Sequence, residues 1–246
     1  MRSNSSGVSI ASTWFSNHPV TPSALIPSVA SSLMAGKPTF SALVVDFGGV
    51  LTTSIWPAFA AFCDRVGLAP ETVRELFRGD EQALKLLRGL ETGAIPEPDF
   101  ERQFAELLGL ESHEGLIGDM FADLGPDEEM VGAVRAAHEA GFKTGLISNS
   151  WGLSIYDRAP IDLFDVSVIS GEVGLHKPQP EIYELACERL GVAASEAVFV
   201  DDLRENCEGA EAVGMTAVLH RETPQTLARL SELFGVELAA GAEAEL

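Results

Sequence analysis

The feature that most constrains the fold is a series of five short apolar runs. They occupy residues 42–47, 144–148, 166–170, 197–202 and 216–220. Short continuous runs rich in β-branched residues indicate strands that are covered on both faces. Helical patterns separate most of the runs, and this alternation predicts an α/β fold with a doubly wound parallel sheet.

The connections between the later strands have helical patterns. Residues 128–141 and 180–192 carry apolar positions at helical spacing, and each pattern stops at a glycine. A third helix is expected over 204–215, between the fourth and fifth strands. The stretch TPQTLARLSELFGVEL near the end of the chain predicts an amphipathic helix.

The segment from about 55 to 126 contains helical patterns only, so it interrupts the alternation. We predict that it is an inserted small α-helical cap. The core would then comprise 39–54 and 127–233, with an acidic tail at 234–246. Residues 1–38 are rich in Ser, Thr, Ala and Pro and have no acid, so we expect a disordered or over-long extension. A transit peptide is the alternative, although arginine is scarce.

Charge and cysteine content exclude several classes of protein. The chain has 16 Lys and Arg against 37 Asp and Glu, a net charge of −21, which disfavours nucleic acids and anionic membrane surfaces as partners. Its three cysteines are an odd number and widely spaced, which argues against a disulfide framework and for the cytoplasm. No apolar run approaches the about 20 residues that span a bilayer. Oligomeric state cannot be read from this composition.

Three of the predicted strands end in polar residues. They are Asp46 at the end of the first, Ser148 and Asn149 at the end of the second, and Asp201 and Asp202 at the end of the fourth. In doubly wound sheets, ligands bind beyond the carboxyl ends of the strands. These residues are therefore the candidates for a functional site.

Four motifs occur in order, each at or after a predicted strand. They are VVDFGGVLT (44–52), LISNS (146–150), SGEVGLHKPQPEIY with Lys177, and VFVDDLRENCEGA (198–210). With these motifs the chain from 42 to about 233 resembles the haloacid dehalogenase (HAD) superfamily, subfamily I. Within it, the chain is similar to the group that includes the phosphatase domain of soluble epoxide hydrolase and bacterial sugar-phosphate phosphatases. The resemblance implies a Rossmann-like core with a helical cap and a Mg²⁺-dependent phosphatase for a small phosphorylated metabolite.

The resemblance also implies which residues perform the chemistry. Asp46 would be the nucleophile that forms an aspartyl-phosphate. Mg²⁺ would be bound by Asp46, by the backbone carbonyl of Gly48 and by Asp202. Asp201 would either bind the metal directly or lie behind the ligands. Three clustered carboxylates repel one another unless a cation lies among them, and such hard ligands suit Mg²⁺.

The remaining motif residues would bind phosphate. The Ser148 hydroxyl and the Asn149 backbone N–H would contact phosphate oxygens, while Lys177 would neutralise the phosphate and hold Asp46 in place. Each candidate has a structural alternative: the aspartates can cap a turn or a helix, and Lys177 can be a solvated charge. Trp56 and its neighbour Phe59 are expected to pack inside the cap rather than line the site.

One residue departs from the family pattern. Most of these phosphatases carry a second Asp two residues after the nucleophile, where this chain has Gly48. That Asp protonates the leaving group, and such general acid–base catalysis contributes about 10²–10⁴-fold. We therefore expect a substrate with a good leaving group, such as a sugar-1-phosphate, an acyl phosphate or an aryl phosphate. The other option is that His176 or a residue of the cap supplies the proton.

Two other functions are compatible with the sequence. The loss of the acid at Gly48 allows a catalytically weak protein of this fold that binds or regulates. A 2-haloacid dehalogenase would also use an Asp nucleophile but needs no metal, and the Asp201–Asp202 pair argues against it. Substrate identity depends on residues 55–126, where the sequence is least informative.

Overall fold

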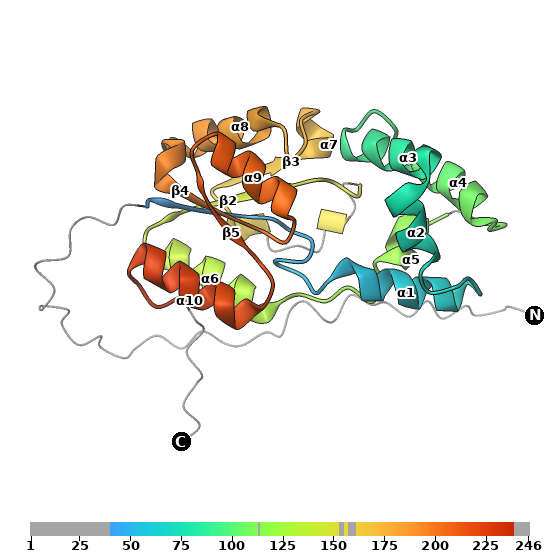
Figure 1. Cartoon of the computed structure of the whole chain (residues 1–246), viewed down its shortest axis with the longest axis horizontal. Coiled ribbons are helices and arrows are strands. Elements are labelled where there is room, and N and C mark those ends of the chain that lie inside the picture. The colour runs from blue at the N-terminus through green and yellow to red at the C-terminus, as the bar shows by residue number, and fades with distance from the viewer. Residues whose placement is uncertain (1–39, 113, 153–154, 157–160, 239–246) are drawn as a thin grey trace, which may run out of the picture. The chain divides into compact units, whose positions relative to one another are not determined.

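The structure is a computed structural model (Figure 1), and it describes residues 40–112, 114–152, 155–156 and 161–238. The extension predicted over 1–38, and residues 239–246 of the predicted tail, lie outside this description. No helix in the described part of the chain has the length and apolar character needed to cross a membrane.

The described residues contain one sheet of five parallel strands. The strands are β1 (Ala42–Val45), β2 (Lys143–Ser148), β3 (Val166–Ile169), β4 (Ala197–Asp201) and β5 (Thr216–Leu219). Their order across the sheet is β3-β2-β1-β4-β5, and all four pairings are parallel. The predicted α/β fold with a doubly wound sheet is therefore confirmed.

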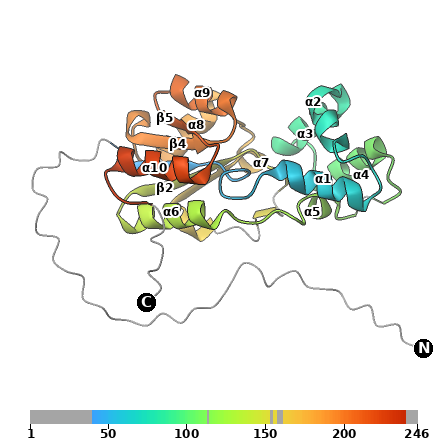
Figure 2. The same cartoon turned by 60° about the horizontal axis from the view of Figure 1, so that its bottom comes forward.

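Helices cover both faces of this sheet (Figures 1 and 2). α6 (Glu128–Glu139) and α10 (Thr223–Phe234) lie on one face, while α8 (Pro180–Leu190) and α9 (Arg204–Ala212) lie on the other. The short helix α7 (Ser170–Val173) follows β3. Two 3₁₀ turns, Ile161–Leu163 and Ala194–Glu196, precede β3 and β4.

Strand β1 shows why the apolar runs are continuous. Successive side chains of a strand point to opposite faces. Leu43 and Val45 therefore pack with the cluster under α6 and α10, while Ala42 and Val44 pack with the cluster under α8 and α9. All four are fully buried, so no position of this strand is left for a polar residue.

The segment between β1 and α6 is helical. Its helices are α1 (Ile55–Arg65), α2 (Thr72–Gly79), α3 (Glu81–Glu91), α4 (Glu97–Leu108) and α5 (Leu116–Met120), and we call them the insert helices. They pack around an apolar cluster of their own, which contains Phe59, Phe62, Phe100 and Phe104. Asp80 is the N-cap of α3, and its carboxylate accepts a hydrogen bond from the backbone N–H of Ala83 at 2.8 Å.

The described end of the chain packs on the core. Phe234 is the last residue of α10, and its ring lies 4.7 Å from that of Phe142. Leu238 is fully buried. The predicted tail at 234–246 therefore begins with residues that belong to the apolar core.

Candidate active site

The sheet order brings the predicted site residues together. β1 lies between β2 and β4, and its register pairs Val45 with both Leu146 and Val200. Asp46, Ser148 and Asp201 consequently meet at the carboxyl edge of three adjacent strands. The chain winds in opposite directions on the two sides of β1, so this edge is the switch point at which doubly wound sheets bind ligands.

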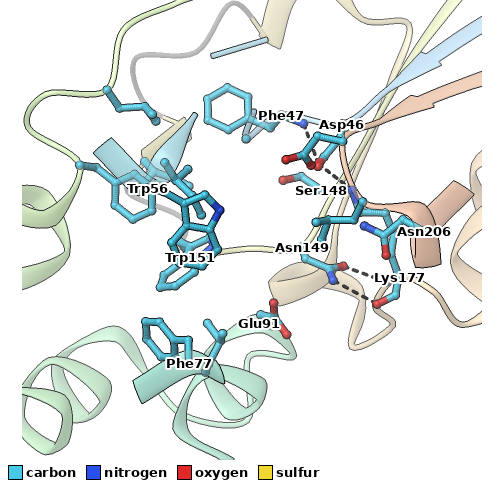
Figure 3. Close-up of a pocket in the computed structure, with 18 residues that line it drawn as sticks. Asp46, Phe47, Trp56, Phe77, Glu91, Ser148, Asn149, Trp151, Lys177 and Asn206 are labelled. Atoms are coloured by element: carbon cyan, nitrogen blue, oxygen red, sulfur yellow. Dashed lines mark hydrogen bonds and ion pairs between the residues drawn. The ribbon is translucent and has the colours of Figure 1, made fainter. Parts of the chain in front are cut away.

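A pocket of about 210 Å³ opens at this edge (Figure 3). Its core side contains most of the predicted site residues, namely Asp46, Gly48, Ser148, Asn149, Lys177 and Asp202. The insert helices and the loops beside them contribute mainly apolar side chains, namely Ile55, Trp56, Phe77, Leu87, Phe121, Leu124, Trp151 and Ile155. Glu91 is the acidic member of the insert side. The pocket thus joins a charged floor to an apolar wall.

Lys177 is the buried cation of the site. Its side chain is 1% exposed, and Nζ lies 2.6 Å from Asp46 Oδ1 and 2.7 Å from Asp201 Oδ2. Burial lowers the pKa of Lys177, but Asp201 and Asp46 more than reverse this, so its pKa is raised and the ammonium stays charged. Lys177 is therefore bound to the site and is not a solvated surface charge.

Asp46 is held in one orientation. Its Oδ1 accepts the Lys177 ion pair and a hydrogen bond of 2.7 Å from the backbone N–H of Phe47. No donor from the described part of the chain contacts Oδ2, so this oxygen is available to a ligand. The pKa of Asp46 is raised to about 7. Burial is the largest cause, the charges of Asp201 and Asp202 also raise the pKa, and Lys177 lowers it.

The two consecutive aspartates have different surroundings. Asp201 is fully buried, and its carboxylate accepts hydrogen bonds from the Leu203 backbone N–H at 2.8 Å and from Asn206 Nδ2 at 3.0 and 3.1 Å. Asp202 instead lines the pocket. Burial, and then the charge of Asp201, raise the pKa of Asp202 to about 6.

These carboxylates fit a divalent cation. Asp46, Asp201 and Asp202 each offer one oxygen within 4.8 Å of the others. All donors are hard oxygens, and Lys177 is the buried cation that faces this group of three carboxylates, so the cluster suits an added positive charge. The backbone also comes close to Asp202: a Cβ on Gly49, whose φ is +76°, would lie 2.8 Å from Asp202 Oδ2. The positive φ favours glycine there, and any other residue would also push the Asp202 carboxylate aside.

Ser148 is oriented by a residue that sequence reasoning missed. The hydroxyl of Tyr156 donates to Ser148 Oγ at 2.7 Å, and burial raises the pKa of Tyr156, so it remains a donor. The Ser148 proton is then free to point to another acceptor. Nothing in the sequence around Tyr156 distinguished it from a core aromatic residue.

Asn149 joins two motifs. Its side-chain Oδ1 accepts from the Lys177 backbone N–H at 2.8 Å, and its Nδ2 donates to the Lys177 carbonyl at 3.1 Å. The sequence suggested a use for the Asn149 backbone only. The side chain instead fixes the loop that carries Lys177 against the loop that follows β2.

The insert side of the pocket differs from expectation in part. Trp56 lines the pocket, whereas Phe59 is buried in the insert cluster. Trp151, directly after LISNS, also lines the pocket and was missed, as was Glu91. His176 is not among the lining residues, and its ring contacts Arg88 Nη1 at 2.6–2.7 Å.

The fold and the site define a protein with a Rossmann-like α/β core, an inserted helical segment and a carboxylate-rich pocket between them. The chain belongs to the haloacid dehalogenase-like hydrolase family, whose sequence model matches residues 40–214. The superfamily expected from the four motifs is thereby confirmed, and with it the assignment of the chain as an enzyme.

Several curated relatives are phosphatases. Phosphatase MT3486 of Mycobacterium tuberculosis is 31% identical over 200 residues, which are 76% of this chain and 90% of that protein. Sesquiterpene phosphatase astK of Aspergillus oryzae is 28% identical, over 80% of this chain and 98% of that protein. Bifunctional epoxide hydrolase 2 of Sus scrofa is 28% identical over 80% of this chain, but the match spans only 39% of the epoxide hydrolase.

Solved structures share the fold. A HAD family enzyme from Bacteroides thetaiotaomicron, in complex with magnesium and inorganic phosphate, superposes with a TM-score of 0.61 at 21% identity. The match covers 74% of this chain and 94% of that enzyme. At this identity the likeness concerns the arrangement of helices and strands.

Proposed function

We propose that the protein is a Mg²⁺-dependent phosphatase that hydrolyses a small phosphorylated metabolite through an aspartyl-phosphate on Asp46. The observation that carries this proposal is the geometry of Asp46. One of its oxygens is fixed by Lys177 and a backbone N–H, while the other is open at the floor of the pocket. The phosphatases among the relatives support the same reaction.

The reaction begins when Asp46 Oδ2 attacks the phosphorus atom of the ester. A bond forms between Asp46 and phosphorus, and the bond from phosphorus to the leaving oxygen breaks, so the leaving group departs as an alcohol once it gains a proton. Water then attacks the phosphorus of the aspartyl-phosphate, which releases inorganic phosphate and restores the Asp46 carboxylate. Lys177 holds the nucleophile through both steps and contributes positive charge beside the phosphoryl group.

Asp46, Asp202 and the Gly48 carbonyl are the groups proposed to hold Mg²⁺. When bound, the metal neutralises charge on the transferring phosphoryl group. Asp201 has its oxygens engaged by Lys177, Leu203 and Asn206. Its proposed part is therefore to position Lys177 rather than to bind substrate.

The phosphate is proposed to bind between the second and third motifs. Ser148 receives a hydrogen bond from Tyr156, so its own hydroxyl proton is available to a phosphate oxygen. The Asn149 backbone N–H is the second proposed donor. The Asn149 side chain keeps Lys177 beside both.

The apolar wall of the pocket indicates the leaving group. Trp56, Phe77 and Trp151 face the charged floor from the side of the insert helices. Such a wall stabilises an apolar or aromatic group more than a hydroxylated sugar. We therefore favour aryl and other apolar esters as substrates, and the relative named as a sesquiterpene phosphatase agrees with an apolar alcohol.

The insert helices are proposed to act as a cap that excludes water from the pocket.

The proposed phosphatase function is tested with an aryl phosphate such as p-nitrophenyl phosphate. We expect phosphate release that requires Mg²⁺ and is lost in Asp46→Asn. Wild-type protein that binds but never turns over phosphate esters would contradict the proposal, as would metal-independent release of halide from a 2-haloacid.

A further inference from the structure

We propose that Glu91, the last residue of α3, is the general acid that protonates the leaving oxygen, a role for which Gly48 has no side chain. This inference rests on the proposed phosphatase function. As Asp46 attacks phosphorus and the ester bond breaks, the Glu91 carboxyl group gives its proton to the leaving oxygen and becomes a carboxylate. When water attacks the aspartyl-phosphate, the Glu91 carboxylate accepts a proton from that water and is restored.

Position is the first argument. Glu91 lines the same pocket as Asp46 and Lys177, and it does so from the opposite, insert side. Figure 3 shows its carboxyl group pointing from α3 towards the core residues. A leaving group lies on the side of the phosphorus away from the nucleophile, because the two oxygens are in line. Glu91 comes from the side on which that oxygen departs.

The end of α3 is fixed, so the carboxyl group is held near the site. The hydroxyl of Ser170, at the start of α7, donates a hydrogen bond to the backbone carbonyl of Glu91. The Glu91 side chain is only 14% exposed. A proton donor for catalysis needs such a fixed position, because an acid that moves freely contributes little.

The surroundings of Glu91 favour the protonated form that an acid needs. Burial raises its pKa to about 7, although the nearby charges of Arg88 and Lys177 lower it. Glu91 is also at the carboxyl end of its helix, where the helix dipole disfavours a negative charge. Both forms are then available near neutral pH, as general acid–base catalysis requires.

The other candidates for this role are less suitable. His176 is not among the residues that line the pocket, and its ring contacts Arg88 and the Lys177 carbonyl. Asp201 is fully buried within its own hydrogen bonds, and Asp202 belongs to the carboxylate cluster. Glu91 lines the pocket and lies outside the cluster formed by Asp46, Asp201 and Asp202.

Glu91 has a structural alternative, which is to pair with Arg88, whose Nε lies 3.9 Å from Glu91 Oε2. Leaving-group dependence separates the two roles. A proton transfer matters for a poor leaving group, such as an alkoxide, and matters little for p-nitrophenolate, which leaves without a proton. Loss of a structural contact would reduce the turnover of both substrates alike.

The experiment compares Glu91→Gln with wild type on phenethyl phosphate and on p-nitrophenyl phosphate, with Mg²⁺ present. The quantity compared is kcat/KM, which ends at departure of the leaving group and so leaves out the hydrolysis step that both esters share. We expect kcat/KM for the alkyl ester to fall about 10²–10⁴-fold, while kcat/KM for the aryl ester falls less than about tenfold. The matched control is Glu81→Gln, an exposed carboxylate at the other end of α3. Equal losses on both esters, or no loss on either, would overturn the proposal.

A second variant asks whether the proton alone is missing. A Cβ on Gly48 would contact only Ile55 Cγ2, at 3.7 Å, so an Asp at position 48 has room at its base. The double variant Gly48→Asp/Glu91→Gln should hydrolyse the alkyl ester at least tenfold faster than Glu91→Gln does. No gain over Glu91→Gln would contradict the inference.

If Glu91→Gln does not fold, wild-type kcat/KM across a series of aryl and alkyl phosphates decides the question. A weak dependence on leaving-group pKa supports proton donation, and a steep dependence overturns it. Failure of the phosphatase function itself looks different: wild type would then hydrolyse neither ester, or Asp46→Asn would remain active.

Discussion

At the scale of single residues, Lys177 stabilises the site by pairing with its buried carboxylates. It is buried with two carboxylates at 2.6 and 2.7 Å, and removal of one partner from such a group leaves an uncompensated buried charge. We expect Lys177→Met to lower the free energy of unfolding by about 3–5 kcal/mol, measured by urea denaturation without Mg²⁺. Lys143→Met is the control, because Lys143 forms an exposed pair with Asp165. A loss no larger than that of the control would contradict this account.

Glu91 makes a separate prediction about pH. Its pKa is raised from 4.5 to about 7 in the folded protein, mainly by burial and against the charges of Arg88 and Lys177. The folded state therefore holds a proton that the unfolded state has released, and stability falls as pH rises from about 4.5 to about 7. Glu91→Gln should lack this loss, so the variant should gain on the order of 1–3 kcal/mol relative to wild type between pH 4.5 and pH 8. A difference that does not change with pH would contradict the burial of an ionisable Glu91.

At the scale of secondary structure, an element is predictable from the sequence when all of its residues are buried in apolar surroundings. The strands are buried on both faces, so their apolar runs were visible in the sequence. The insert helices were also predicted as helices. Which of their aromatic residues meets the pocket was not predictable. Trp56 and Phe59 lie three residues apart on α1 with ring centroids 5.9 Å apart, yet Trp56 lines the pocket while Phe59 is buried in the insert cluster.

The same limit applies to the polar residues of the site. Asp46, Ser148 and Asp202 lie at the ends of predicted strands, and a parallel sheet brings such ends together. Glu91 ends a helix of the insert, and nothing in the sequence separates it from the exposed Glu81 on the same helix. Its position became apparent only when α3 was placed against the core.

The loop after β2 gives a prediction at this scale. Asn149 makes two hydrogen bonds to the backbone of Lys177, and these tie that loop to the one before α8. Asn149→Ala should let Lys177 shift from Asp46, and small displacements of catalytic groups cost up to about 10²-fold in rate. We expect kcat on p-nitrophenyl phosphate to fall at least tenfold while the circular dichroism spectrum is unchanged. Wild-type kcat would show that the tie does not position Lys177.

At the scale of the whole molecule, the acidic surface must admit an anionic substrate. The net charge is −21, while Lys177 and a bound cation would supply local positive charge. Salt screens the long-range repulsion more than contacts inside the pocket. We therefore expect kcat/KM for p-nitrophenyl phosphate to rise between about 10 and 150 mM KCl, with kcat little changed. A clear fall in kcat/KM would contradict this explanation.

The same charge leads us to expect neither nucleic-acid nor membrane partners. The site depends on one arrangement of three strand ends, one buried lysine and one pocket shared with the insert helices. The function proposed for that arrangement requires a covalent bond between Asp46 and phosphorus.

That bond can be sought directly. Protein mixed with ³²P-labelled phenyl phosphate and Mg²⁺ is quenched in acid during turnover, and the labelled peptide is identified by mass spectrometry. The account predicts Mg²⁺-dependent label on the peptide that contains Asp46 and none in Asp46→Asn. Turnover by Asp46→Asn at the wild-type rate, or label confined to another residue, would contradict it.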